Sequence, residues 1–402
     1  MRVQEPDISD STSEIDDTFA ASLDFDKIVD PASWRPPGEY YQTMPSAVRA
    51  AVSSVVESDV RLRQELRNES LPALLKAGTI QCWAKAVPEY IETLQRKRLY
   101  TGQVFAADAT IAKYETLSLV GAQIAVSKVS YQGNTGQIVS NIMHWGKELP
   151  RKATAADIVQ AIRTRGKEIK EKLSNVFLYA LTLYKERQVL LDSAPGTFKL
   201  IQGTIFPYEM LVGSGAQHTM LPCLKLLGAL IDDGNYATIV SKSAQRELVF
   251  LGSALDPGEY IVVNTGTQVL ENFLTGGDSG GSRAHYTSTP IPEYGGQSQI
   301  DLFTEFQETY GPKVVQGVLR AHPMSAPYVF YCNKDRLEEA VHMLLADAAN
   351  TGPRGFPLLV DLADQYCSGA FRASEYTSHM NAEFAKASGG SGMYQSERSS
   401  RD

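Results

Sequence analysis

The chain has 402 residues, of which 43% are hydrophobic and 21% charged, a composition typical of a globular protein with one large domain or several smaller ones. Its formal net charge of −8 argues against a protein that coats DNA by bulk electrostatic attraction, but it is compatible with carboxylates that hold divalent cations. We expect no membrane span, because no apolar run approaches about 18 residues. The four cysteines are scattered without a CxxC pair, which argues against a zinc ribbon or disulfide framework and favours the reducing cytoplasm.

The N-terminal part is predicted to be a polar segment followed by helices. Residues 1–40 are rich in Ser, Asp and Glu and are expected to form an acidic flexible tail, with a docking arm for a partner as the alternative. Apolar residues near helical spacing predict a long helix over 46–67, and a second helix is predicted over 89–97. The basic cluster 96–98 at the end of that helix is either a solvated helix end or a phosphate contact.

A lone acidic residue interrupts the first predicted strand, which covers residues 104–110. Asp108 stands there among apolar neighbours, and a second β-rich run follows over 117–131. A buried carboxylate without a partner costs several kcal/mol, so hydrogen bonds or a bound cation must compensate it. The alternative is an Asp at a strand end that caps a turn.

The remainder of the chain alternates between helical and strand patterns. The predicted elements are helices over 154–173 and 177–191, strands over 198–206, 237–241 and 260–263, a Gly/Ser/Pro-rich loop over 275–299, a strand over 328–331, a helix over 335–349, a turn over 352–355 and a helix from 358. Strands with intervening helices predict an α/β class. We expect one domain over 41–388 and a second flexible tail over 389–402.

Acidic and amide side chains occur on several of these elements. Asp108 lies on the first strand, Glu186 on a helix and Gln202 on the strand that follows it, while Asp361 and Asp364 open the last helix. A two-metal hydrolase needs oxygen ligands from separate elements, and Mg²⁺ and Mn²⁺ prefer such ligands. The order of these residues along the chain is that of an RNase H-like metal site.

In these motifs the chain resembles the NurA nucleases. The resemblance depends on Asp108-Ala109-Thr110 in the first strand, on Glu186 in the helix before the next strand and on Gln202-Gly203-Thr204-Ile205 in that strand. It continues with Lys242 after a later strand, and it ends with Gly355-Phe356-Pro357 followed by Asp364. None of these motifs is specific alone, so the resemblance depends on their order.

The resemblance implies an RNase H-like mixed sheet with flanking helices and a helical N-terminal extension. It further implies a DNA nuclease that uses Mn²⁺ or Mg²⁺, with Asp108, Glu186 and Asp364 as ligands and Gln202 as a weak ligand or an orienter of water. Lys242 would stabilise phosphate charge. The implied partners are DNA, a second copy of the chain and a HerA-type hexameric ATPase, in DNA end processing or antiviral defence.

The sequence departs from the family pattern where the family has a second strand Asp and this chain has Gln202. Asp364 could supply the missing charge, and Glu209 is a less favoured substitute. The loss also allows a non-catalytic adaptor that contacts the ATPase and guides DNA. A nuclease directed at RNA is a third possibility, since one fold supports several substrates.

Overall fold

The computed structural model describes residues 37–115, 119–133, 138–146, 175–212, 217–241, 245–275 and 295–388, together with residues 30, 34, 286, 288 and 290–292. The chain forms two compact units, one of residues 1–74 with 272–284 and one of residues 75–271 with 285–402. The predicted tails 1–40 and 389–402 lie mostly or wholly outside the described residues, so the division into one domain and two tails stays a prediction.

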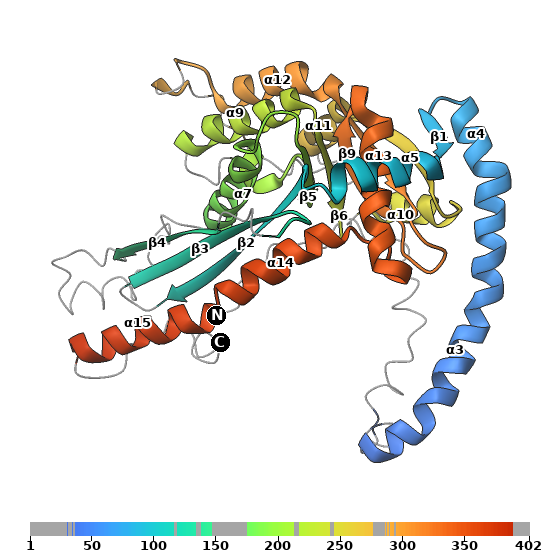
Figure 1. The fold of residues 1–402 in the computed structure, drawn as a ribbon, viewed down its shortest axis with the longest axis horizontal. Helices are drawn as coiled ribbons and strands as arrows, with labels where there is room; N and C mark the ends of the chain where they lie inside the picture. Colours follow the sequence, from blue (N-terminus) through green and yellow to red (C-terminus); the bar gives the residue numbers. More distant parts are fainter. Residues whose placement is uncertain are drawn as a thin grey trace. The chain divides into compact units, whose positions relative to one another are not determined.

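The first unit is dominated by one long helix, α3 (Pro37–Glu65), drawn in blue in Figure 1. A π-helical turn, η3 (Leu66–Ser70), follows it and leads into α4 (Leu71–Lys76). The helix predicted over 46–67 is therefore present but begins earlier, with Pro45 inside it. Its valines are exposed, Val55 by 59%, so their helical spacing does not mark a face buried in the described structure.

The second unit is built on one mixed sheet, which has nine strands in the described part of the chain. Their order is β1-β7-β8-β9-β6-β5-β2-β3-β4, in which the β2–β5 and β5–β6 pairs are parallel and the others antiparallel. The strands are β1 (Cys82–Lys85), β2 (Val104–Glu115), β3 (Leu119–Val129), β4 (Ile138–Gly146), β5 (Phe198–Gln202), β6 (Tyr236–Val240), β7 (Glu259–Thr265), β8 (Val314–Leu319) and β9 (Tyr328–Asn333).

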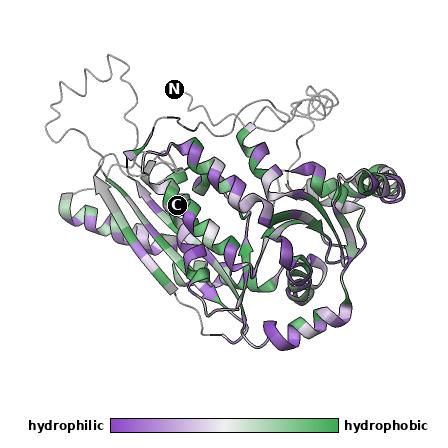
Figure 2. Cartoon of the chain, turned by 90° about the horizontal axis from the view of Figure 1, so that it is seen from above, coloured by the Kyte–Doolittle hydropathy of each residue, from purple (hydrophilic) through white to green (hydrophobic). Residues whose placement is uncertain are grey.

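Helices flank this sheet (Figure 1), and hydrophobic and hydrophilic residues alternate along them (Figure 2). They are α5 (Pro88–Leu94), η4 (Gln95–Leu99), α7 (Asn175–Leu191), α8 (Tyr208–Leu211), α9 (Gln217–Asp233), α10 (Arg246–Ser253), α11 (Gly266–Thr275), α12 (Gln299–Tyr310), η8 (Gly311–Lys313), η9 (Lys334–Arg336), α13 (Leu337–Ala348), η10 (Ala349–Arg354), α14 (Leu358–Ala370) and α15 (Ala373–Ser388). Among the described helices, none is both long and apolar enough to cross a bilayer.

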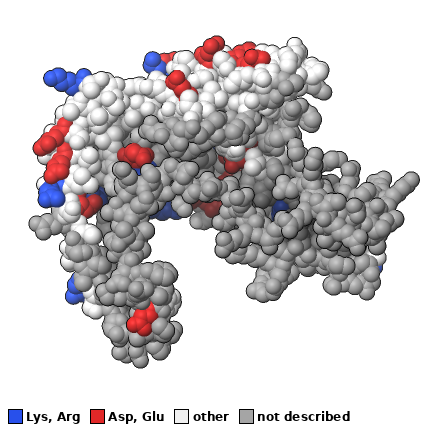
Figure 3. All heavy atoms as spheres, turned by 180° about the vertical axis from the view of Figure 1, so that it is seen from behind, with Lys and Arg blue, Asp and Glu red and all other residues white. Residues whose placement is uncertain are grey.

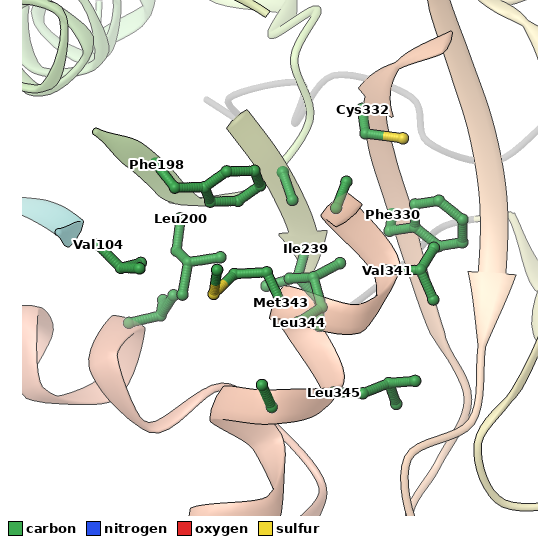
Figure 4. Packing of buried hydrophobic residues seen from close by; sticks show 14 of the residues in the cluster. Val104, Phe198, Leu200, Ile239, Phe330, Cys332, Val341, Met343, Leu344 and Leu345 are labelled. Atoms are coloured by element: carbon green, nitrogen blue, oxygen red, sulfur yellow. The ribbon is translucent and has the colours of Figure 1, made fainter. Parts of the chain in front are cut away.

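The main hydrophobic core lies between one face of the sheet and helices α13 and α14. Alternate residues of the strands supply it, such as Val104 and Leu200, because successive side chains of a strand point to opposite faces. Met343 and Leu344 of α13 pack against them (Figure 4). A smaller cluster joins the far end of β2, at Tyr114, to α15.

The predicted α/β class, with a mixed sheet and flanking helices, is confirmed. One strand is shorter than predicted: the strand over 198–206 ends at Gln202, because Gly203 turns the backbone with a φ of +88°. The predicted helix over 154–173 and parts of the loop over 275–299 lie outside the described residues.

Candidate functional site

Asp108 lies on β2, one residue beyond the point where the pairing of β2 with β5 ends. The parallel ladder between these strands ends at Ala107↔Ile201, whereas β2 continues to Glu115 paired with β3. Asp108 is partly buried and shares a face of β2 with Val104 and Ala106, which belong to the main core. The lone acid of the predicted strand is therefore in mid-strand and does not cap a turn.

Helix α14 brings a second carboxylate to Asp108. The helix packs across β2 and β3, and the Asp364 side chain lies within hydrogen-bonding reach of the Asp108 carboxyl. Burial and the nearby Asp364 charge raise the pKa of Asp108 from 3.8 to about 7. Two acids that share one site in this way favour a shared proton or a bound cation.

Glu186 lies on α7, which also packs on β2 and β3, and its carboxyl is fully buried. Burial, opposed by the Arg187 charge and aided by the Asp108 charge, raises the pKa of Glu186 from 4.5 to about 8. The Glu186 Oε1 atom lies 3.6 Å from Arg187 Nη1 and accepts no hydrogen bond. Arg187 is itself 1% exposed and donates from Nη2 to the Thr204 carbonyl at 3.0 Å, so it ties α7 to the turn after β5.

Gln202 ends strand β5 at the same end of the β2–β5 ladder as Asp108. Ala106 pairs with Leu200 and Ala107 with Ile201, and this pairing stops one residue before Asp108 on β2 and one residue before Gln202 on β5. Gln202 itself pairs with Ile239 of β6. The sequence resemblance expects an acid at this position.

Other predicted candidates have different positions. Asp361 forms a two-point ion pair with Arg354, one bond of which measures 3.0 Å, and this pair occupies its carboxylate. Glu209 lies on α8, where its charge acts on Arg187 rather than on Asp108. Lys242 lies outside the described residues.

The basic cluster 96–98 is largely used in ion pairs. Arg96 pairs with Glu92 and Arg98 with Glu339, and Arg98 also donates to the Gly196 carbonyl at 2.6 Å. The phosphate-contact alternative therefore gains no support from the structure. No continuous basic band crosses the described atoms of the face shown in Figure 3.

The oxygen donors around Asp108 are of the kind that a hard divalent cation binds, but in the described part of the chain too few acidic side chains lie together there to hold an ion. The Asp108 and Asp364 carboxylates, the Gln202 amide and a buried Glu186 oxygen that accepts no hydrogen bond are all oxygen donors of the kind that Mn²⁺ and Mg²⁺ prefer. Within the described ranges, however, no three acidic, His or Cys side chains lie close enough together to hold one ion. The Asp108 charge acts on Glu186, but these two acids and Asp364 do not form a three-ligand cluster in the described residues.

Three buried residues around the site were missed by sequence reasoning. Ser127 is directly opposite Asp108 on β3, Arg187 accompanies Glu186, and Asp347 accepts a hydrogen bond from the Leu359 amide of α14. Arg187 could have been found from the sequence, because it is a charged residue directly after the predicted ligand Glu186. The other two depend on contacts between distant segments.

Comparison with known proteins gives similarity at the level of solved structures. No family model and no curated protein matches the chain. Its structure is similar to the NurA nuclease from Sulfolobus solfataricus, with a TM-score of 0.42, 11% identity and coverage of 88% of this chain and 98% of that one. It is also similar to a second NurA structure (TM-score 0.45, 8% identity, 83% and 96% covered) and to NurA bound to dAMP and manganese (0.43, 9%, 85% and 96%).

Proposed function

We propose that the chain is a metal-dependent phosphodiester hydrolase that cleaves DNA. The observation that carries the proposal is the contact between Asp108 and Asp364, two carboxylates from a central strand and a late helix. Asp108 is partly buried while Asp364 is exposed, and without a cation these two like charges repel each other. Stability alone gives no reason to place two acids there.

In this proposal Asp108 and Asp364 hold a divalent cation, Mn²⁺ or Mg²⁺, with Gln202 as a weaker oxygen donor and Glu186 as a ligand drawn in on binding. When bound, two such ions would activate water for attack on a phosphodiester and stabilise the leaving oxygen. Asp108 would release its proton on metal binding. Lys242 would stabilise the charge of the phosphate.

DNA as substrate, a homodimer and a HerA-type hexameric ATPase as partner follow from the sequence resemblance. A translocase that delivers DNA would suit a chain with a net charge of −8, which does not attract DNA by bulk charge. The biological role would be DNA end processing or antiviral defence. In this proposal the protein works in the cytoplasm, and its four cysteines are free.

A non-catalytic adaptor is the second candidate, and two observations favour it. Gln202 supplies an amide where a carboxylate would bind a metal more strongly, and no three acids converge in the described residues. An adaptor would keep the fold and the ATPase contact but would not cleave DNA.

The test is cleavage of end-labelled linear DNA by the purified protein with Mn²⁺ or with EDTA, each with and without the partner ATPase. We expect cleavage with Mn²⁺ only and none from Asp108→Ala. Asp335→Ala, the same change at an exposed acid outside the site, should leave cleavage unchanged. An inactive wild type in the presence of the ATPase supports the adaptor, and equal cleavage by Asp108→Ala contradicts the site. A labelled RNA of the same sequence tests the substrate class.

A further inference from the structure

Three buried hydrogen bonds at regular intervals hold helix α14, one to helix α13 and two to strand β3. The Leu359 amide donates to Asp347 Oδ2 at 2.8 Å. The Ala363 carbonyl accepts a hydrogen bond from Ser127 Oγ at 2.8 Å, and the Cys367 thiol donates to the Ala125 carbonyl at 3.4 Å. Residues 359, 363 and 367 are four apart, so all three bonds lie along one face of the helix.

This arrangement fixes the rotation of α14 about its own axis as well as its position. Leu359, Ala363 and Cys367 are each fully buried, so their side of the helix faces the sheet. Asp364 follows Ala363 directly and is displaced from it by about 100° around the helix. The bond at Ala363 is therefore the nearest of the three to the carboxylate that meets Asp108.

Ser127 is the residue that joins the two halves of the acidic pair. It stands directly opposite Asp108 in the β2–β3 ladder, and directly opposed side chains of antiparallel strands share one face and have Cβ atoms about 5 Å apart. Its hydroxyl donates to the carbonyl immediately before Asp364. One fully buried side chain thus contacts the backbone that carries Asp364 while standing beside Asp108.

We infer that Ser127 is a positioning residue that sets Asp364 against Asp108 through the Ala363 carbonyl. The inference rests on the proposed function, in which these two carboxylates hold the metal. It assigns to Ser127 the role of outer partners of metal ligands, whose loss typically costs about 10- to 100-fold in metal affinity.

The test is the affinity for Mn²⁺ of the full chain, measured by calorimetry. Ser127→Ala should weaken binding by about tenfold or more. Ser127→Cys keeps the volume and a weak donor, so we expect an intermediate affinity, and it preserves the test if the Ala variant does not fold. The matched control is Ser130→Ala, a buried serine at the end of the same strand whose hydroxyl accepts from the Gln132 amide at 3.3 Å; its affinity should equal that of the wild type.

Hydrogen exchange of the α14 amides in the metal-free variants separates positioning from simple support of the helix. Faster exchange in Ser127→Ala together with weaker Mn²⁺ binding supports the inference. Faster exchange with unchanged Mn²⁺ affinity, or no change in either, overturns it and leaves the proposed function intact. A wild type that does not bind Mn²⁺ overturns the proposed function, and the positioning role falls with it.

Discussion

Replacing Asp108 by Asn should stabilise the metal-free protein. Burial and Asp364 raise the pKa of Asp108 from 3.8 to about 7, and each factor of ten in proton affinity corresponds to about 1.4 kcal/mol. The ionised carboxylate therefore lowers the free energy of unfolding by up to about 4 kcal/mol above neutral pH. Because part of the carboxyl is exposed to water, which screens its charge, we expect a gain of about 2 kcal/mol in Asp108→Asn.

The stability difference between Asp108→Asn and the wild type should depend on pH in a defined direction. The folded-state pKa lies above the unfolded one, so the stability contributed by this group is fully present below about pH 3.8 and is lost as the pH rises to about 7. The difference between variant and wild type should thus be near zero at about pH 4 and reach its maximum above pH 7. Urea unfolding in EDTA over this range measures it.

A matched substitution controls for the general effect of removing an acid. Asp335→Asn changes an exposed carboxylate at the start of η9, where we expect a change within about 0.5 kcal/mol. Mn²⁺ should remove the advantage of Asp108→Asn, since the cation stabilises only the wild type. An Asp108→Asn variant that is less stable than the wild type at about pH 8, or equally stable throughout, would refute the reasoning.

Three further predictions concern the rest of the site and the assembly. Arg187→Met removes the ion-pair partner of the buried Glu186 carboxyl and should lower the free energy of unfolding by about 3–5 kcal/mol in urea; an unchanged midpoint would show that the pair is not coupled. Gln202→Asp adds a carboxylate beside the acidic pair, so it should lower the Mn²⁺ concentration needed for cleavage, and an unchanged requirement would remove this position from the site. Deletion of residues 1–30 and 389–402 should leave a dimer by light scattering, because these polar segments have little apolar surface to bury, and a monomer would place the interface in them.

Elements with a strong local pattern were predictable from the sequence. The apolar runs of α7 and α13 produced expected ranges close to the observed ones, because burial of a continuous apolar stretch depends little on context. Strand β2 begins where predicted but continues to Glu115, beyond the predicted end at residue 110. Strand β8 was missed, since Gly317 weakens a strand pattern. The structure explains that glycine: a Cβ there would lie 2.3 Å from the Ile261 carbonyl oxygen on the neighbouring strand. Helix α9 was missed as well, and Pro222 inside it reads as a break.

The sequence predicted which residues belong to the candidate site but not how they are arranged in space. The sequence pointed to Asp108 and Asp364 as separate acids in the right order, and the structure places them in contact. The placement of α14 depends on Ser127 and Asp347, which come from remote segments and carry no local signal. The sequence likewise gave no sign that Arg354 engages Asp361, since that ion pair depends on the turn at Gly355, where φ is +61°.

The most direct test of the metal site is a crystal of the protein soaked in Mn²⁺ and measured for anomalous scattering by manganese. The account predicts a peak between the Asp108 and Asp364 carboxylates in the wild type and no such peak in Asp108→Asn. A wild-type crystal without a peak at this position, or the same peak in the variant, would contradict it.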